Sequence, residues 1–364
     1  MAAGVGHIFA SIAKCRVKGM KFGRRSERLM GQPGISFHLN IPPSKDAVGM
    51  DVFKSQSWNH SMKKALLFLS LTLAVSTTVN ADEVTRCSTV DPSPDVMAAI
   101  TAKALATPHS NPPAVIKIAW HEIIKSDGTG AISTERMREQ ISDLNRSMQA
   151  NGIPITFQLA SWSEYTSDSW FSSCEDNQDM RDILAIAPQN YINVYSCSDA
   201  SGSLGKASIP YFLQGDEGSK ENFVYVNFNT LPGGEGPYAE GATLVHEIGH
   251  YLGLVHVFEI GYGVCAAGNN PLTGTGNWSG DFIMDTPPQS MPTAGCPMVA
   301  PSTCPGSQNS IHNYMDYSND ICLTTFTPGQ RDLMYAATSL LRPTLWAGGG
   351  GAARASVLAP IKIP

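Results

Sequence analysis

The sequence predicts an α/β fold in which one sheet lies beside a cleft, and three observations lead to this prediction. Short apolar and β-branched segments typical of strands recur between residues 115 and 228. A segment with the spacing of an amphipathic helix, 134–150, stands between the first two of them. After residue 256 these regular patterns give way to Gly, Pro, Asn and four cysteines. The second half of the fold is therefore expected to be loop-rich and held by disulfides.

The individual elements follow from local patterns. Strands are expected at four places: 115–120, 155–159, 191–195 and 223–228. Helix 134–150 carries apolar residues three or four positions apart, at Met137, Ile141, Leu144 and Met148. Asn151-Gly152 is expected to end this helix, because glycine adopts the left-handed conformation at a helix C-terminus without a steric cost. A last helix is predicted from Thr327 to about Leu341, and a flexible tail over 347–364.

The first part of the chain contains a segment with the form of a secretory signal peptide, at residues 62–81. Met62 is followed by two lysines, an apolar run and a small-x-small cleavage site ending at Ala81. A signal peptide belongs at the start of a protein, so we interpret residues 1–61 as a mis-annotated upstream extension. A genuine cytosolic extension or targeting arm is the alternative. Residues 82–112 are expected to form a pro-segment of low order with one short helix near 96–105, and residues 113–346 the main domain.

Charge and cysteine content favour a secreted protein. Eleven of the 25 Lys and Arg, but only three of the 31 Asp and Glu, precede residue 82, so the remainder has a net charge near −14. Such a charge repels nucleic acid and anionic membranes, and no other stretch is long and apolar enough to span a bilayer. Seven cysteines follow residue 82, which fits three disulfides and one unpaired thiol in an oxidising compartment. We expect a monomer that binds neither nucleic acid nor membranes.

One motif points to metal chemistry: HEIGHYLGLVH at 246–256, which has the form H-E-x-x-H-x-x-G-x-x-H. On a helix, His246 and His250 leave the same face one turn apart, so one Zn²⁺ can bind both imidazoles. Gly253 can adopt positive φ and turn the chain, which lets His256 return as a third ligand.

The same motif also distinguishes a catalytic from a structural metal. Three protein nitrogens leave a fourth position open for water, as in catalytic zinc sites. Glu247, next to the first ligand, is placed to take a proton from that water. The competing interpretation is a buried helix whose histidines are satisfied by hydrogen bonds. The number of defined positions in the motif favours a zinc hydrolase site with one Zn²⁺.

A second motif carries a family resemblance. Asn313-Tyr-Met-Asp-Tyr317, with Cys322 and Thr327-Pro-Gly-Gln330 after it, resembles the methionine-bearing turn of the metzincin metallopeptidases, and within them the pappalysin family. The short secreted members of that family from fungi and archaea are the most similar, over about residues 113–342. The resemblance implies a metzincin-type catalytic domain over 113–346, with a twisted mixed sheet, helices above the cleft and a disulfide-stapled lower subdomain.

The resemblance also implies roles for three residues near the second motif. Met315 would pack beneath the three imidazoles, which differs little from an ordinary core methionine. Tyr317 would stabilise the oxyanion of the tetrahedral intermediate, unless it is a plain surface or core tyrosine. Asp320 would lie at the floor of the S1′ pocket and select Lys or Arg after the scissile bond, with a solvated loop acid as the alternative.

Further roles implied by the resemblance concern calcium, disulfides and latency. The loop at 280–287 resembles the calcium-binding loop of the family, with oxygen ligands from the side chains of Asp281 and Thr286 and the carbonyl of Met284, and a plain turn as the competing interpretation. The implied disulfides are Cys265–Cys304, Cys296–Cys322 and Cys174–Cys197, whereas the sequence alone permits fifteen pairings of six cysteines. Cys87 would be a cysteine switch that holds its thiolate on the zinc of a zymogen. Arg86-Cys-Ser88 departs from the expected Cys-Gly, and an unpaired or intermolecular cysteine is the alternative.

These observations predict a secreted zinc endopeptidase that hydrolyses peptide bonds of extracellular proteins. Two other classes compete with it: a catalytically silent secreted protein that binds zinc and serves in adhesion, and a zinc hydrolase acting on something other than protein. The intact set of His246, Glu247 and Tyr317 argues against the first. The presence of the methionine turn beside the zinc motif argues against the second.

Overall fold

The computed structural model describes residues 85–106, 114–213, 216–258, 265 and 280–347, all within one compact unit that spans 77–364. The predicted upstream extension (1–61), the signal peptide (62–81) and the tail beyond Ala347 lie outside the described residues. No helix among the described residues has both the length and the apolar character needed to cross a membrane.

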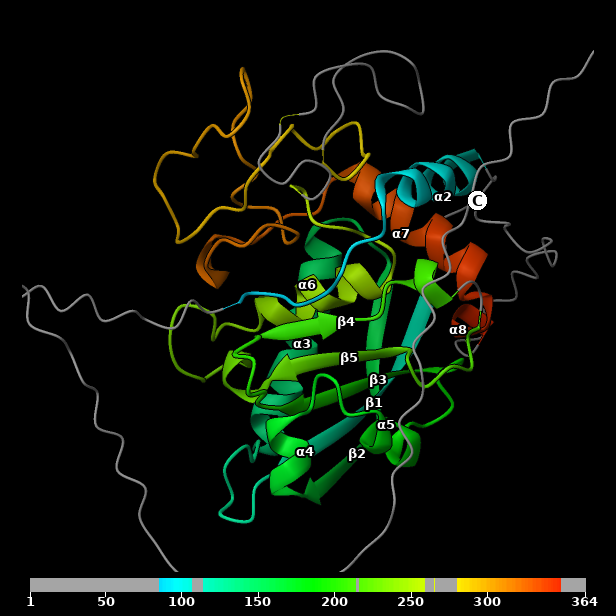
Figure 1. Cartoon of the computed structure of the whole chain (residues 1–364), viewed down its shortest axis with the longest axis vertical. Helices are drawn as coiled ribbons and strands as arrows, with labels where there is room; N and C mark the ends of the chain where they lie inside the picture. The colour runs from blue at the N-terminus through cyan, green and yellow to red at the C-terminus, as the bar shows by residue number, and fades with distance from the viewer. Residues whose placement is uncertain (1–84, 107–113, 214–215, 259–264, 266–279, 348–364) are drawn as a thin grey trace, which may run out of the picture. The chain divides into compact units, whose positions relative to one another are not determined.

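A five-stranded sheet forms the centre of the unit (Figure 1). Its strand order is β2-β1-β3-β5-β4. The bounds are β1 Ala114–Ile124, β2 Ile155–Thr166, β3 Tyr191–Cys197, β4 Gly205–Ala207 and β5 Phe223–Asn227. Neighbouring strands run parallel except β4, which pairs with β5 in the antiparallel sense. The predicted mixed sheet is therefore confirmed, and β4 is one of its two edges.

The sheet separates two apolar cores because successive side chains of a strand point to opposite faces. Val194 and Val224 join the main core with α3 and α6, whereas their neighbours Tyr195 and Tyr225 join a smaller core on the other face. The bounds of these helices are α3 Thr134–Ala150 and α6 Ala242–Tyr251. The smaller core is covered by α4 (Asp168–Ser172) and α5 (Gln178–Leu184).

Helix α3 has the bounds that its apolar spacing predicts. The Ser133 side chain caps its first turn by accepting a hydrogen bond from the Arg136 backbone N–H, and Gly152 follows its end with φ of 65°. The strands at 115–120, 155–159, 191–195 and 223–228 are present as well, with β1 and β2 longer than expected. Short elements such as β4, α4, α5 and α8 (Pro343–Ala347) are too brief to leave a periodic signal.

Helix α7 (Pro328–Leu341) supports the loop-rich half of the unit. Its N-terminus has a capping box in which Thr327 and Gln330 exchange side-chain and backbone hydrogen bonds. The Gln330 side chain also pairs with that of Asn313, at 2.8 and 3.1 Å, so the cap of α7 holds the turn that contains Met315. The segments before α7 are mostly irregular, as the sequence predicts for the loop-rich half, and they contain the short 3-10 helix η4 (Asp320–Cys322).

Arg342, just after α7, is buried and connects three segments. Its guanidinium donates to the Asn222 side chain and to the carbonyls of Tyr251 and Ser208, and it lies 3.7 Å from the centroid of the Tyr251 ring. Because Tyr251 ends α6, this contact fixes the C-terminus of that helix against α7.

Arg342→Ala is therefore expected to lower the free energy of unfolding by about 3 kcal/mol, since it leaves several buried acceptors without a donor. Urea unfolding of the two proteins, followed by circular dichroism, measures the change. Arg331→Ala, which removes an arginine whose partner Asp332 is partly exposed, should change stability by less than about 0.5 kcal/mol. Equal unfolding midpoints for the two variants would contradict this role of Arg342.

The segment that the sequence analysis interprets as a pro-segment differs from the expectation of low order. Its described part, residues 85–106, which we call the leader, contains helix α2 (Pro94–Ala106). Met97 and Ile100 of α2 are buried in the main core, and α2 packs on α7 (Figure 1). The stretch before α2 follows the edge strand β4: the Leu204 N–H donates to the Thr85 carbonyl and the Ser88 N–H to the Gly205 carbonyl, both at 3.0 Å. The edge of the sheet is thus covered by the leader.

Candidate metal centre

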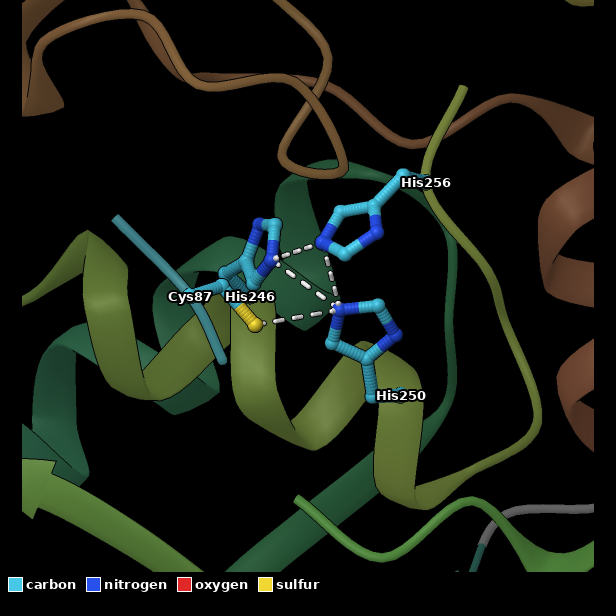
Figure 2. A group of neighbouring side chains, drawn as sticks. All are labelled: Cys87, His246, His250 and His256. Carbon is cyan, nitrogen blue, oxygen red and sulfur yellow. Dashed lines mark hydrogen bonds between the residues drawn. The ribbon is translucent and has the colours of Figure 1, made fainter. Parts of the chain in front are cut away.

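Helix α6 carries the first two histidines of the motif. It begins after Gly241, whose φ of 84° requires a residue without a side-chain penalty, and all of its residues are buried between the sheet and the lower loops. His246 and His250 lie one turn apart and face the same point (Figure 2). Their positions follow directly from the spacing that the sequence shows.

Gly253 turns the chain after α6 so that His256 comes back toward the helix. Its φ is 108°, and a Cβ at this position would lie 2.6 Å from the Ala337 Cβ, which no side chain could accommodate without a shift. The Leu254 N–H donates to the Gly249 carbonyl and closes the turn at 2.9 Å. This is the structural role that the sequence predicts for Gly253.

The Nε2 atoms of the three histidines converge on one point. The distances between them are 3.1 Å for His250–His246, 3.1 Å for His250–His256 and 3.3 Å for His246–His256. Ligands about 2.0–2.1 Å from a tetrahedral metal are roughly 3.3 Å apart, so the spacing suits one zinc ion. Figure 2 shows the imidazoles and the Cys87 thiol facing this common point.

The opposite nitrogens fix the orientation of the rings. Nδ1 of His246 lies against the Tyr314 carbonyl, and Nδ1 of His250 lies 3.0 Å from the Leu254 carbonyl. Nδ1 of His256 lies 2.8 Å from Oδ2 of Asp91, a leader residue. With each Nδ1–H donated in this way, each Nε2 carries a lone pair aimed at the same place, which is the donor set that a zinc ion needs.

Glu247 lies beside these ligands with its side chain fully buried. Burial raises the pKa of its carboxyl to about 8. Its Oε2 accepts a hydrogen bond from the Thr89 hydroxyl of the leader at 3.1 Å. A Cβ on Gly205 would lie 2.4 Å from Oε1, so the edge strand β4 approaches the carboxyl closely where it has no side chain.

Tyr317 and Met315 belong to the second motif, which packs against α6. The Tyr317 ring is 5.0 Å from the His256 ring, and its hydroxyl donates to the Cys87 carbonyl at 3.2 Å. Met315 is fully buried, and a Cβ on Gly249 would lie 2.6 Å from its sulfur, so it packs directly under α6. The structure therefore brings both residues to the histidine cluster.

Cys87 lies at the same cluster. Its Sγ is 3.6 Å from Nε2 of His250, and one ligand atom from each of Cys87, His246, His250 and His256 lies within 4.8 Å of the others. The thiol is buried, and burial together with the Glu247 charge raises its pKa to about 12 in the absence of a metal. Among the described residues this is the one group of at least three His, Cys, Asp or Glu with metal-ligand spacing.

Asp320 is buried at the start of η4 and is not a solvated loop acid. Its Oδ2 accepts hydrogen bonds from the N–H groups of Glu240 and Ala242, at 3.0 and 3.1 Å, at the N-terminus of α6. Its Oδ1 lies 2.7 Å from Nη2 of Arg86 in the leader, and the Arg86 guanidinium also stacks over the Tyr238 ring at 4.5 Å. Both charged side chains of this ion pair are almost completely buried.

The sequence analysis missed three leader residues that contact the site: Arg86, Thr89 and Asp91. Arg86 contacts Asp320, Thr89 contacts Glu247, and Asp91 contacts His256. The sequence offers one signal: the residue directly before Cys87 is basic, so its charge is opposite to that of Asp320. Nothing local marks Thr89 or Asp91, whose partners are more than 150 positions away.

Among the described residues, the loop at 280–287 holds no group of at least three His, Cys, Asp or Glu with metal-ligand spacing. Asp281 is buried, and its Oδ1 accepts hydrogen bonds from the Ile283 N–H at 3.0 Å and from the Thr286 hydroxyl at 2.6 Å. The calcium assignment to Asp281, Met284 and Thr286 therefore stays a prediction, as does the monomeric state.

Three disulfides join the pairs that the family resemblance implies. Cys174–Cys197 ties the segment after α4 to the end of β3. Cys265–Cys304 and Cys296–Cys322 connect the irregular segments after residue 256. The lower subdomain is thus stapled by covalent links, as predicted, and Cys87 is left as a free thiol.

Comparisons with known proteins identify a peptidase family and relatives named metalloproteases. The model of peptidase family M43, described as pregnancy-associated plasma protein-A, matches residues 176–339. An extracellular metalloprotease of Arthroderma gypseum is 36% identical over 214 residues, which cover 58% of this chain and 68% of the relative. One from Verticillium alfalfae is 33% identical over 288 residues, which cover 74% and 96%.

Solved structures support the fold. Mature mirolysin of Tannerella forsythia, in complex with a cleaved peptide, matches with a TM-score of 0.53 and 25% identity, over 66% of this chain and 97% of mirolysin. A mutant of promirolysin from the same organism matches with a TM-score of 0.53 and 22% identity, over 69% and 88%.

The fold and the matches define the class of protein: a zinc metallopeptidase of the metzincin type. The histidine cluster fits the catalytic metal that this class requires. More particularly, the chain belongs to the pappalysin family, peptidase family M43.

Proposed function

We propose that the chain is a secreted endopeptidase that holds one zinc ion on His246, His250 and His256 and cleaves extracellular proteins before Lys or Arg. The convergence of three buried Nε2 atoms at 3.1–3.3 Å from one another is the observation that carries the metal assignment. Secretion is supported by the signal-peptide pattern at 62–81 and by relatives that are named extracellular metalloproteases.

The chemistry divides between the metal and the protein. When bound, zinc supplies a Lewis acid that polarises the scissile carbonyl and lowers the pKa of water. Glu247 takes a proton from the attacking water and delivers it to the leaving amine, a role that suits a buried carboxyl with a pKa raised to about 8. The Tyr317 hydroxyl donates a hydrogen bond to the developing oxyanion once it is released from the Cys87 carbonyl.

The leader keeps this site closed, and we assign the zymogen switch to Cys87. The position of its Sγ within the histidine cluster supports the assignment, since a thiolate is a strong zinc ligand and would fill the open coordination position. The Thr89 hydrogen bond to Glu247 occupies the general base at the same time. The leader also covers the edge strand β4, a strand edge to which an extended peptide could add.

The preference for Lys or Arg at P1′ is supported by the ion pair inside the leader-bound site. Asp320 is buried at the start of η4, against the N-terminus of α6, and among the described residues its ion-pair partner is Arg86. A buried carboxylate selects a cationic partner strongly, because leaving it unpaired in a desolvated pocket is costly. Arg86 would then occupy the place that a substrate Lys or Arg takes after the leader is removed.

Digestion of a proteome-derived peptide library by the secreted chain, after mass spectrometry has confirmed loss of the leader, tests this proposal. The expected result is one zinc per chain and cleavage mainly before Lys and Arg. Purified protein that binds zinc but leaves the peptides and casein intact would favour the catalytically silent, adhesive alternative. Protein that binds no zinc would contradict the metal assignment.

Asp320→Asn should lower the ratio of kcat/KM for peptides with Arg at P1′ to those with Ala by on the order of 10²-fold, because the substitution removes the buried charge and keeps the shape. The same library digest measures the ratio. Asp182→Asn, an exposed acid on the far side of the sheet, is the matched control and should not change it. An unchanged Arg preference in Asp320→Asn would assign the specificity to another residue.

A further inference from the structure

The three proposed zinc ligands differ in where the partner of their second ring nitrogen comes from. His246 and His250 donate to the main-chain carbonyls of Tyr314 and Leu254, which belong to the catalytic domain. His256 donates to the carboxylate of Asp91, which belongs to the leader. One of the three imidazoles is therefore oriented by a segment that the proposed activation removes.

The contact between Asp91 and His256 is buried and specific. Oδ2 of Asp91 is 2.8 Å from Nδ1 of His256 and 3.4 Å from its backbone N, and the two side chains are 1% and 2% exposed. Among the described residues, His256 is the one ion-pair partner of Asp91. Helix α2 starts three positions later and is anchored on the main core by Met97 and Ile100. The chain that follows Asp91 is therefore held in place.

A buried carboxylate behind a histidine affects the metal in front of it. It fixes the tautomer and the ring orientation, makes the imidazole a stronger donor, and adds a negative charge that a dication compensates. Leader docking and zinc binding should thus favour each other, and the coupling is reciprocal by thermodynamic necessity.

We propose that Asp91 is a positioning residue for zinc, which acts through His256 and makes the leader-bound chain hold its metal more tightly than the chain whose leader has been removed. The proposal rests on the zinc assignment of the proposed function and adds a second task to the leader. Besides closing the site, the leader helps the newly made protein to acquire and keep its metal.

The test uses the full chain with Glu247→Ala, so that the leader is not removed by self-cleavage. The protein is loaded with one equivalent of Zn²⁺ and challenged with a chromogenic zinc chelator, and both the rate and the equilibrium of zinc transfer are recorded. Asp91→Asn, which keeps the shape and removes the charge, should weaken zinc binding by about 10–100-fold. Asp95→Asn, an exposed acid in the first turn of α2, should leave it unchanged.

Two further measurements separate a role toward the metal from a merely structural one. Asp91→Glu keeps the charge and should hold zinc better than Asp91→Asn. Hydrogen exchange of the leader amides, with and without zinc, should show that zinc protects the leader of the parent chain and protects that of Asp91→Asn much less. A structural role alone would make the leader of Asp91→Asn exchange faster by the same factor in both conditions.

The outcomes distinguish the inference from the proposed function. A parent chain that takes up no zinc would overturn the proposed function itself. A parent chain that binds zinc, with an Asp91→Asn variant that releases it no faster than the parent, would overturn the inference and leave the proposed function standing. Equal zinc release from Asp91→Asn and Asp91→Glu, or from Asp91→Asn and Asp95→Asn, would also overturn the inference.

Discussion

Glu247→Ala is expected to lower the rate of peptide hydrolysis by roughly 10²–10⁴-fold while the zinc content stays near one per chain. The carboxyl lies beside His246 on α6, is completely buried, and belongs to none of the three nitrogen positions that converge on the metal site. Removing it should therefore abolish proton transfer without removing a ligand. The measurement is kcat/KM on a quenched fluorescent peptide, together with elemental analysis of zinc.

The control for this prediction is Glu240→Ala, an exposed glutamate shortly before the same helix, which should keep full activity. The leader adds an internal readout: full-length Glu247→Ala should remain uncleaved during incubation, whereas the wild-type chain shortens. Loss of zinc together with activity would mean that Glu247 holds the site together rather than acting as a base. Activity close to that of the wild type would assign the proton transfer to a different group.

Cys87→Ala is expected to abolish latency, so that the full-length chain cleaves peptides from the first moment of the assay. A leader that closes the site 99% of the time leaves about 1% of the activity, and its release therefore raises the initial rate by roughly 10²-fold. The thiol contributes the contact to the metal site, while Arg86 and Asp91 keep their own partners in the variant. Initial rates measured before self-cleavage, with leader integrity followed by mass spectrometry, give the comparison.

Ser88→Ala is a matched control for Cys87→Ala because it changes the adjacent side chain, whose hydroxyl contacts the Gly205 carbonyl rather than the histidines. It should show the same lag as the wild type. A lag that persists unchanged in Cys87→Ala would mean that Arg86 and the backbone contacts to β4 maintain latency without the thiol. The variant should bind zinc as the wild type does once the leader has been removed, since the three histidines remain.

Much of the fold could be predicted because its signals are local. The apolar spacing of 134–150 and the Gly at 152 specify α3 within the chain itself, and the histidine motif specifies both α6 and the turn at Gly253. Strand β4 could not be predicted, since three residues are too few for an alternating pattern. Its place at the sheet edge is set by pairing with β5.

The site was predictable in the same uneven way. His246, His250 and His256 are close in sequence, so their spacing carries the geometry. The contacts of Thr89 with Glu247 and of Asp91 with His256 join residues 158 and 165 positions apart. Such contacts depend on how α2 docks on α7, which no local pattern encodes. The expectation of low order for the leader was wrong for the same reason: its order comes from packing against the rest of the unit.

The short helix η4 places Asp320 two positions before Cys322, which is bonded to Cys296. The carboxylate that we assign to substrate choice therefore sits on a turn whose shape depends on thiol oxidation. A chain that folded in a reducing cytoplasm would lack this disulfide, and the turn that carries Asp320 would be more mobile. The preference for Lys or Arg at P1′ would then be established only after secretion, once the chain had left the cytoplasm and its proteins.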